Sequence, residues 1–490
     1  MEFFLNDKNK KKLELFKELI FKDGEKVSFS YLQHYLGISL STLKRYFDEL
    51  EGDFQNNPEL KQIYFEKNMG GYQLNNHSHF KIDYLVIHMR LYYLNESLQF
   101  KIISSILSQH YATAEELADD LFVSIPYLYK QINTLNEQLS IFHLKVIFNV
   151  TENLQGEEKF LRMFYFYFYW NAYRGIIMPA ESELNSILSC SNMMKNLQTN
   201  YCSSVTKRIK LMLGISILRQ RKKTIQLSTE IKSILQSFID VTHISTIVKK
   251  YFVSEDEHLF FNLMLRSFIS DIDTSEEKKL LYHSFSRTSP LVFSCELLIN
   301  EYEKEFYPST PMSPKEKNSI FYYVLIGLVH CTYFEINPLY FFRQVLINEQ
   351  DNIEFLKKYI KKHPKNYYFY KNFRKNHPKF VIDPSFNLGI CMLLTILTDM
   401  FLLPSVTIYI QYSSNNFGSV FIKNRLLTLF NPETIHFTKK ISDADIAIID
   451  NFEVHEEKEK QKFFFVNSFL DERMWLELIV FIQKNLLNND

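Results

Sequence analysis

The chain carries two stretches with one short pattern, SYLQHYLGISLSTLKRYF at residues 30–47 and TAEELADDLFVSIPYLYKQI at residues 113–132. In each stretch a short amphipathic segment leads into a brief turn that ends in serine, and a second amphipathic segment follows. This spacing predicts a helix-turn-helix, a motif whose second helix enters the major groove of DNA. Two such motifs in one chain favour a protein that acts on duplex DNA.

A candidate β-hairpin follows each motif. Residues 62–67 alternate like a strand, residues 68–71 have a turn composition, and residues 72–74 return as a second strand. Residues 144–150 and the turn sequence at 153–156 repeat this plan after the second motif. A hairpin behind a recognition helix is the wing of a winged helix, so we expect two such units, at 1–78 and 79–160.

Helix starts are also marked in the second unit. Thr113 with Glu116 has the spacing of a capping box, in which each side chain bonds the backbone N–H of the other residue. Ser124 is the expected N-cap of the following helix, which we expect to be the recognition helix of this unit.

The apolar stripe of each second helix predicts which side chains face outward and could touch DNA. These residues, with the tip of the first hairpin, are Ser41, Thr42, Lys44, Arg45, Lys67, Asn68, Tyr127, Tyr129, Lys130 and Asn133. Lys44 and Arg45 suit guanine edges or phosphates. The alternatives are an ordinary solvated face around Arg45, a packing surface for a neighbouring domain around Lys130, and a hairpin without a role in binding.

Composition limits the class of protein. The 490 residues have a formal net charge of zero, and 46% of them are hydrophobic, as expected for packed cores. The first 75 residues hold 11 Lys and Arg against 12 Asp and Glu, so any DNA contact depends on local placement of positive charge. The five cysteines are scattered without a CxxC pair, and no glycine-rich phosphate loop occurs; we expect no metal and no cofactor.

The remaining chain changes character near residue 404. Residues 157–403 have an almost wholly helical pattern, with a boundary expected near 286–290, whereas apolar runs alternate with helices from 404 onward, as in a small parallel α/β sheet. The fold class expected is multidomain and mainly α: two winged helix-turn-helix units, two all-α helical bundles at 161–286 and 287–403, and an α/β domain at 404–490. Residues 386–403 approach membrane-spanning length, but Asn387 and Asp399 favour a buried core helix.

Residues 154–165 (LQGEEKFLRMFY) and 169–175 (YWNAYRG), together with the domain order, resemble the Mga/AtxA family of virulence and carbohydrate-responsive regulators. The resemblance implies tandem winged helices, two regulatory domains of the phosphotransferase-system (PTS) type, called PRDs, and a C-terminal domain like enzyme IIB (EIIB). It also implies regulation through phosphorylated histidines, with phosphocarrier proteins of sugar uptake as partners. We expect a homodimer, with the last domain supplying part of the interface or a docking surface.

The histidine pattern departs from the one the resemblance implies. Residues 211–221 hold no histidine, and His330 lies on the matching helix of the second bundle without the expected arginine after it. His243 and His283 are further candidate phosphoacceptors. A buried core histidine is the alternative for His330. The loop at 411–416 lacks the nucleophilic cysteine of enzyme IIB domains, so we expect this domain to have lost phosphotransfer.

These observations predict a cytoplasmic, non-enzymatic transcription regulator that binds duplex DNA and itself. Two alternatives stay open. An RNA-binding antiterminator also carries paired regulatory domains, although it would begin with a small β-rich domain. A phosphotransfer component of sugar uptake would need an acceptor in the last domain.

Overall fold

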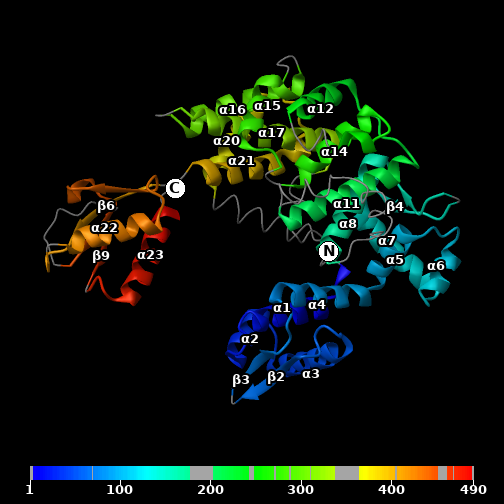
Figure 1. Ribbon diagram of the computed structural model, residues 1–490, viewed down its shortest axis with the longest axis horizontal. Helices are drawn as coiled ribbons and strands as arrows, with labels where there is room; N and C mark the ends of the chain where they lie inside the picture. Colours follow the sequence, from blue (N-terminus) through cyan, green and yellow to red (C-terminus); the bar gives the residue numbers. More distant parts are fainter. Residues whose placement is uncertain are drawn as a thin grey trace. The chain divides into compact units, whose positions relative to one another are not determined.

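The computed structural model describes residues 4–68, 70–149, 151–176, 202–241, 248–269, 272–285, 289–308, 311–336, 363–402, 405–415, 417–450, 461–466 and 468–487. The chain divides into two compact units, Met1–Leu393 and Leu394–Asp490 (Figure 1). It is mainly helical with a small parallel sheet near the C-terminus, which confirms the coarse fold class. The predicted five-part division stays a prediction.

The first helix-turn-helix lies on a three-stranded antiparallel sheet of order β1-β3-β2. The hairpin predicted after the recognition helix is present, and Asn68 pairs with Gly71 at its tip. A Cβ at Gly71 would collide with the Val27 carbonyl oxygen, so glycine is needed where β1 and β3 approach closely. The elements are α1 (Asp7–Ile20), β1 (Lys26–Ser28), α2 (Phe29–Leu36), α3 (Leu40–Asn56), β2 (Ile63–Asn68) and β3 (Gly71–Asn76).

The second helix-turn-helix follows with a shorter hairpin. Its strands pair antiparallel, Lys145 with Gln155 and Val146 with Leu154. The long aromatic helix α8 then leads into the helical region. The elements are α4 (Ile82–Glu96), α5 (Leu98–Ser108), α6 (Ala114–Asp120), α7 (Ile125–Leu139), η2 (Ser140–Phe142), β4 (Lys145–Val146), β5 (Leu154–Gln155) and α8 (Glu158–Tyr173).

The helical region packs across the boundary expected near residue 286. Helix α15 lies against α17, and the Lys278 ammonium donates to the Tyr323 hydroxyl at 2.9 Å. The described elements are α11 (Ser203–Gln220), α12 (Thr229–Val241), η3 (Lys249–Tyr251), α14 (Glu255–Phe268), α15 (Ser275–Ser284), α16 (Pro290–Phe306), α17 (Pro314–Phe334), α20 (Pro364–Asn376), η4 (Pro384–Phe386) and α21 (Asn387–Phe401).

One helical stretch in the described residues, Pro384–Phe401, is long and apolar enough to cross a membrane. Its side chains Ile390, Cys391 and Leu397 are almost fully buried. Because 39% of the whole stretch is buried, its interpretation as a core helix stays a prediction.

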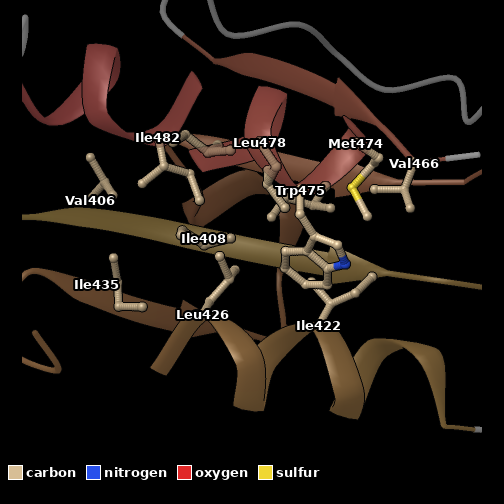
Figure 2. Packing of buried hydrophobic residues seen from close by; sticks show 12 residues of the cluster. Val406, Ile408, Ile422, Leu426, Ile435, Val466, Met474, Trp475, Leu478 and Ile482 are labelled. Atoms are coloured by element: carbon tan, nitrogen blue, oxygen red, sulfur yellow. The ribbon is translucent and has the colours of Figure 1, made fainter. Parts of the chain in front are cut away.

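The C-terminal unit contains a four-stranded parallel sheet of order β7-β6-β8-β9. Buried side chains of both described helices converge on β6, among them Leu426 from α22 and Leu478 from α23 (Figure 2). Strands and helices predicted after residue 404 are therefore present. They are β6 (Val406–Gln411), α22 (Gly418–Leu429), β7 (Ile435–Thr438), η5 (Ile441–Asp443), β8 (Ile446–Ile449), β9 (Lys462–Phe465) and α23 (Glu472–Leu487).

Candidate nucleic-acid interface

The turn of the first motif is fixed by backbone hydrogen bonds. Helix α2 ends at Gly37, whose φ of +60° is in the left-handed region that favours glycine. The Ile38 N–H then donates to the Gln33 carbonyl at 3.2 Å. Ser39 begins α3, and its hydroxyl accepts from the Thr42 N–H at 3.2 Å. The predicted helix, turn and serine cap are all present.

Helix α3 buries one face and exposes the other. Leu43, Phe47 and Leu50 are buried, and the Phe47 ring stacks on Tyr72 of the hairpin with 3.6 Å between ring centroids. On the opposite face the candidate residues Ser41, Lys44 and Arg45 are exposed and Thr42 is half-buried. The Arg45 guanidinium lies 4.0 Å from the Glu49 carboxylate, a solvent-screened contact that leaves it available for DNA.

The second turn repeats the first one, 85 residues later in the chain. Phe122 has a φ of +54° where the first motif has Gly37. The Val123 N–H donates to the Ala118 carbonyl at 3.0 Å, as Ile38 does to Gln33. Serine again begins the following helix, so the two turns share one backbone geometry.

Two details of the predicted capping are wrong. Ser124 lies at the N-cap of α7 but its side chain makes no capping hydrogen bond. Pro126, in the first turn of the helix, has no N–H to donate. Thr113 does accept from the Glu116 N–H at 3.3 Å, but the Glu116 carboxylate accepts from the Ala112 N–H at 2.7 Å. The second bond of the predicted capping box therefore comes from the Ala112 N–H and not from the Thr113 N–H.

Helix α7 presents the four candidate residues of the second motif to solvent. Leu128, Ile132, Leu135 and Leu139 are buried on its inner face. The exposed residues on its outer face include Tyr127, Tyr129, Lys130 and Asn133. Both recognition helices therefore offer an accessible surface.

The two hairpins hold the remaining candidates. Lys67 is exposed on β2 and Asn68 is half-buried, with its side-chain amide 3.5 Å from the Gln73 side-chain oxygen. In the second hairpin, the Asn153 amide donates to the Tyr111 carbonyl at 2.7 Å, and its oxygen accepts from the Tyr111 N–H at 2.8 Å. These two hydrogen bonds fix the second hairpin to the loop before α6.

A buried ionic network, which we call the arginine network, joins the second hairpin to the helical region. Arg162 of α8 is 1% exposed, and its guanidinium donates to Glu158 at 2.9 Å and to both oxygens of Glu257 on α14. Arg219 of α11 donates to Glu158 at 2.9 and 2.6 Å. It also lies 2.9 Å from Glu152 in the loop of the hairpin. Charged contacts thus run from the hairpin to α11, from α11 to α8, and from α8 to α14.

The candidate phosphoacceptor histidines differ in accessibility. His330 is buried in α17, and burial lowers its pKa to about 3, so its ring is neutral at physiological pH. His283 on α15 is exposed. His243 lies outside the described residues.

The loop after the first strand of the C-terminal unit is closed by a carboxylate. The Asp450 oxygens accept from the backbone N–H groups of Ser413 and Ser414 at 2.8 and 2.9 Å and from both hydroxyls. Partial burial works against the charged form, but these four donors hold the pKa of Asp450 below its ordinary value. The hydroxyls of this loop therefore serve an internal anion.

Sequence reasoning missed two features of the interface. Phe122 was not singled out, although the 85-residue offset places it at the position of Gly37 in the first motif. The arginine network was also missed because Arg162 and Glu257 are far apart in the chain.

Residues 84–169 match the family model of the Mga helix-turn-helix domain. No curated protein matches the chain. The matched segment runs from α4 to α8 and so includes α6, the Phe122 turn and α7. The match supports a DNA-binding transcription regulator with duplex DNA as its partner. At the family level it favours a non-enzymatic protein.

Proposed function

We propose that this protein is a cytoplasmic, Mga-like transcription regulator that grips duplex DNA with two winged helices. The observation that carries the proposal is the exposure of the outer faces of α3 and α7, in a chain whose residues 84–169 match the Mga helix-turn-helix domain. Recognition helices must lie on the surface to enter a groove.

The first winged helix supplies most of the positive charge. Lys44 and Arg45 on α3 and Lys67 on the hairpin are exposed, and they contact phosphates or guanine edges. Lys130 is the matching cation on α7. Ser41, Thr42, Asn68 and Asn133 fix the position of the helices through neutral hydrogen bonds to the backbone.

A gel-shift titration of mixed-sequence duplex fragments tests this assignment. Substituting Arg45→Ala and Lys130→Ala together should weaken binding about tenfold or more and lower the slope of log affinity against log salt by about 2. The matched control removes two exposed lysines of the helical region, Lys279→Ala and Lys304→Ala. Equal affinity and salt slope in the two double variants would remove the site assignment, and competition by hairpin RNA over duplex would favour the antiterminator.

Regulation passes through the helical region. The arginine network gives it a physical connection, because a shift of α11 moves Arg219, the partner of Glu152 in the second hairpin. A shift of α14 moves Glu257 and so Arg162 of α8, whose neighbour Glu158 also binds Arg219. His283 is the phosphoacceptor candidate that a phosphocarrier protein reaches directly, whereas His330 needs α17 to open first. Incubation with phosphoenolpyruvate and the general phosphocarriers should label wild-type protein and not His283→Ala. Label at residues 404–490 would instead favour the phosphotransfer enzyme.

The C-terminal unit supplies a homodimer interface. On α23, Leu476 and Val480 are four residues apart and both exposed, which gives the helix an apolar outer stripe beside its buried one. Light scattering should report a dimer for the wild type and a monomer for Leu476→Asp with Val480→Asp. Leu280→Asp on α15 is the control for an exposed leucine elsewhere, and its mass should stay dimeric.

A further inference from the structure

The two helix-turn-helix units share a backbone but differ in the chemistry of their reading faces. The 85-residue offset pairs Gly37 with Phe122, Leu40 with Ile125, Ser41 with Pro126, Lys44 with Tyr129 and Arg45 with Lys130. Four of these positions are apolar or aromatic in the second unit. In the first unit the same positions hold a glycine, one leucine, a hydroxyl and a lysine.

Phe122 is the most unusual of these residues. Its side chain is 94% exposed, and its φ of +54° lies in the region that glycine prefers. A bulky residue in this region raises the conformational free energy of the folded chain. Because the phenyl ring is exposed, no burial of apolar surface offsets that cost. Strain of this kind is typical of functional positions, where a partner recovers what the free protein gives up.

Two further exposed apolar side chains follow Phe122 in the sequence, at the start of α7. Ile125 and Tyr129, one turn apart on the helix, are also exposed large apolar side chains. Helix α6, in contrast, exposes Glu115 and Asp119, which repel phosphates. Lys130 is the cation that the candidate face of α7 offers, so attraction to the DNA backbone is weak in this unit.

An apolar surface in the major groove has one complementary group. Each base pair presents hydrogen-bond donors and acceptors there, and only thymine adds a methyl group, at C5. We propose that the second unit reads thymine methyl groups through an apolar wedge formed by Phe122, Ile125 and Tyr129. This inference rests on the proposed function. In this proposal the first unit binds phosphates through its positive charges, and the second unit selects thymine.

The test compares alternating polymers that differ only in that methyl group. Poly d(A-T) and poly d(A-U) present the same donors and acceptors in both grooves, but uracil lacks the C5 methyl. The wild type should bind poly d(A-T) more tightly, by about fourfold for each methyl group buried. Poly d(G-C) has no thymine, but its guanine edges can bind Lys44 and Arg45, so it serves as a duplex that reports general DNA binding and not the methyl preference.

Two variants connect the preference to the wedge. Phe122→Gly restores the residue found at the first turn, so it should melt at a higher temperature than the wild type and lose most of the thymine preference. Ile125→Ser should lose part of the preference with unchanged melting. Phe21→Ala removes an exposed phenyl ring at the end of α1 and should behave as the wild type.

Each outcome decides between the inference and its basis. Equal affinity of the wild type for poly d(A-T) and poly d(A-U) overturns thymine reading while leaving the regulator intact. An undiminished preference in Phe122→Gly overturns the wedge and directs attention to a protein partner for this surface. Absence of binding to any of the three duplexes contradicts the proposed function itself.

Discussion

Removing the Arg162 guanidinium should destabilise the Met1–Leu393 unit strongly. In Arg162→Met, Glu158 keeps its two bonds from Arg219. Glu257 loses both bonds from the guanidinium and keeps a bond from the Ile225 backbone N–H, at 2.8 Å. The Glu257 side chain is fully buried, so the variant leaves one poorly compensated carboxylate in the interior. Breaking one side of a buried ion pair costs about 3–5 kcal/mol.

This cost is a large share of the stability of an ordinary domain, which is about 5–15 kcal/mol. For a unit of about 390 residues, about 1.2 °C of melting temperature corresponds to 1 kcal/mol, so we expect a decrease of roughly 4–6 °C. The assay is thermal unfolding followed by circular dichroism at fixed protein concentration. The control is Lys304→Met, which removes an exposed partner of Glu301. It should change the free energy of unfolding by less than about 1 kcal/mol.

A double variant separates buried charge from lost packing. Arg162→Met with Glu257→Met removes both members of the pair and leaves only neutral backbone groups at Lys223 and Ile225 without their partners. It should recover most of the loss, to within about 2 kcal/mol of the wild type. If Arg162→Met melts like the surface control, or if the double variant is less stable than the single one, the electrostatic reasoning is refuted.

Two further perturbations test other parts of the structure. The pKa of His330 is about 3 when folded and about 6.5 when unfolded, so the unfolded chain binds the extra proton and stability falls as pH decreases between these values. At pH 5 the loss should be about 2 kcal/mol relative to pH 7, and melting curves of His330→Gln should show a correspondingly flatter pH dependence. Asp450→Ala should lower the free energy of unfolding of the C-terminal unit by about 1 kcal/mol, because four donors from Ser413 and Ser414 lose their acceptor. The denaturant midpoint should fall accordingly, and an unchanged midpoint would contradict that role.

Local patterns in the sequence were sufficient for the elements that carry the interface. The apolar spacing around Leu43 and Leu128 predicted the inner faces of α3 and α7, and the turn composition at residues 68–71 predicted the first hairpin. These signals depend on neighbours within a few residues, where helix and strand periodicity act directly.

Other features depend on residues that only the fold brings together. Ser124 has the residue type of a cap and lies at the N-cap, yet its side chain makes no capping hydrogen bond. Pro126 removes one of the two backbone donors that such a cap can use. Arg162 looked like one more charged residue in an aromatic helix, because its partner Glu257 lies 95 positions away. The burial of His330 likewise depends on the helices that pack against α17, and the sequence of α17 alone does not predict it.

Helix α15 precedes the expected boundary between the two helical bundles but packs against a helix that follows it. The buried Asp273 carboxylate just before α15 is bonded to Arg266 at 2.8 and 2.9 Å and accepts from the Tyr322 hydroxyl of α17. Exchange of either bundle for a homologous one, by recombination near residue 286, would separate acid from hydroxyl and uncover both helices. The helices α15 and α17 therefore act as one packing unit, and a hybrid protein joined near residue 286 should be less stable than one joined elsewhere.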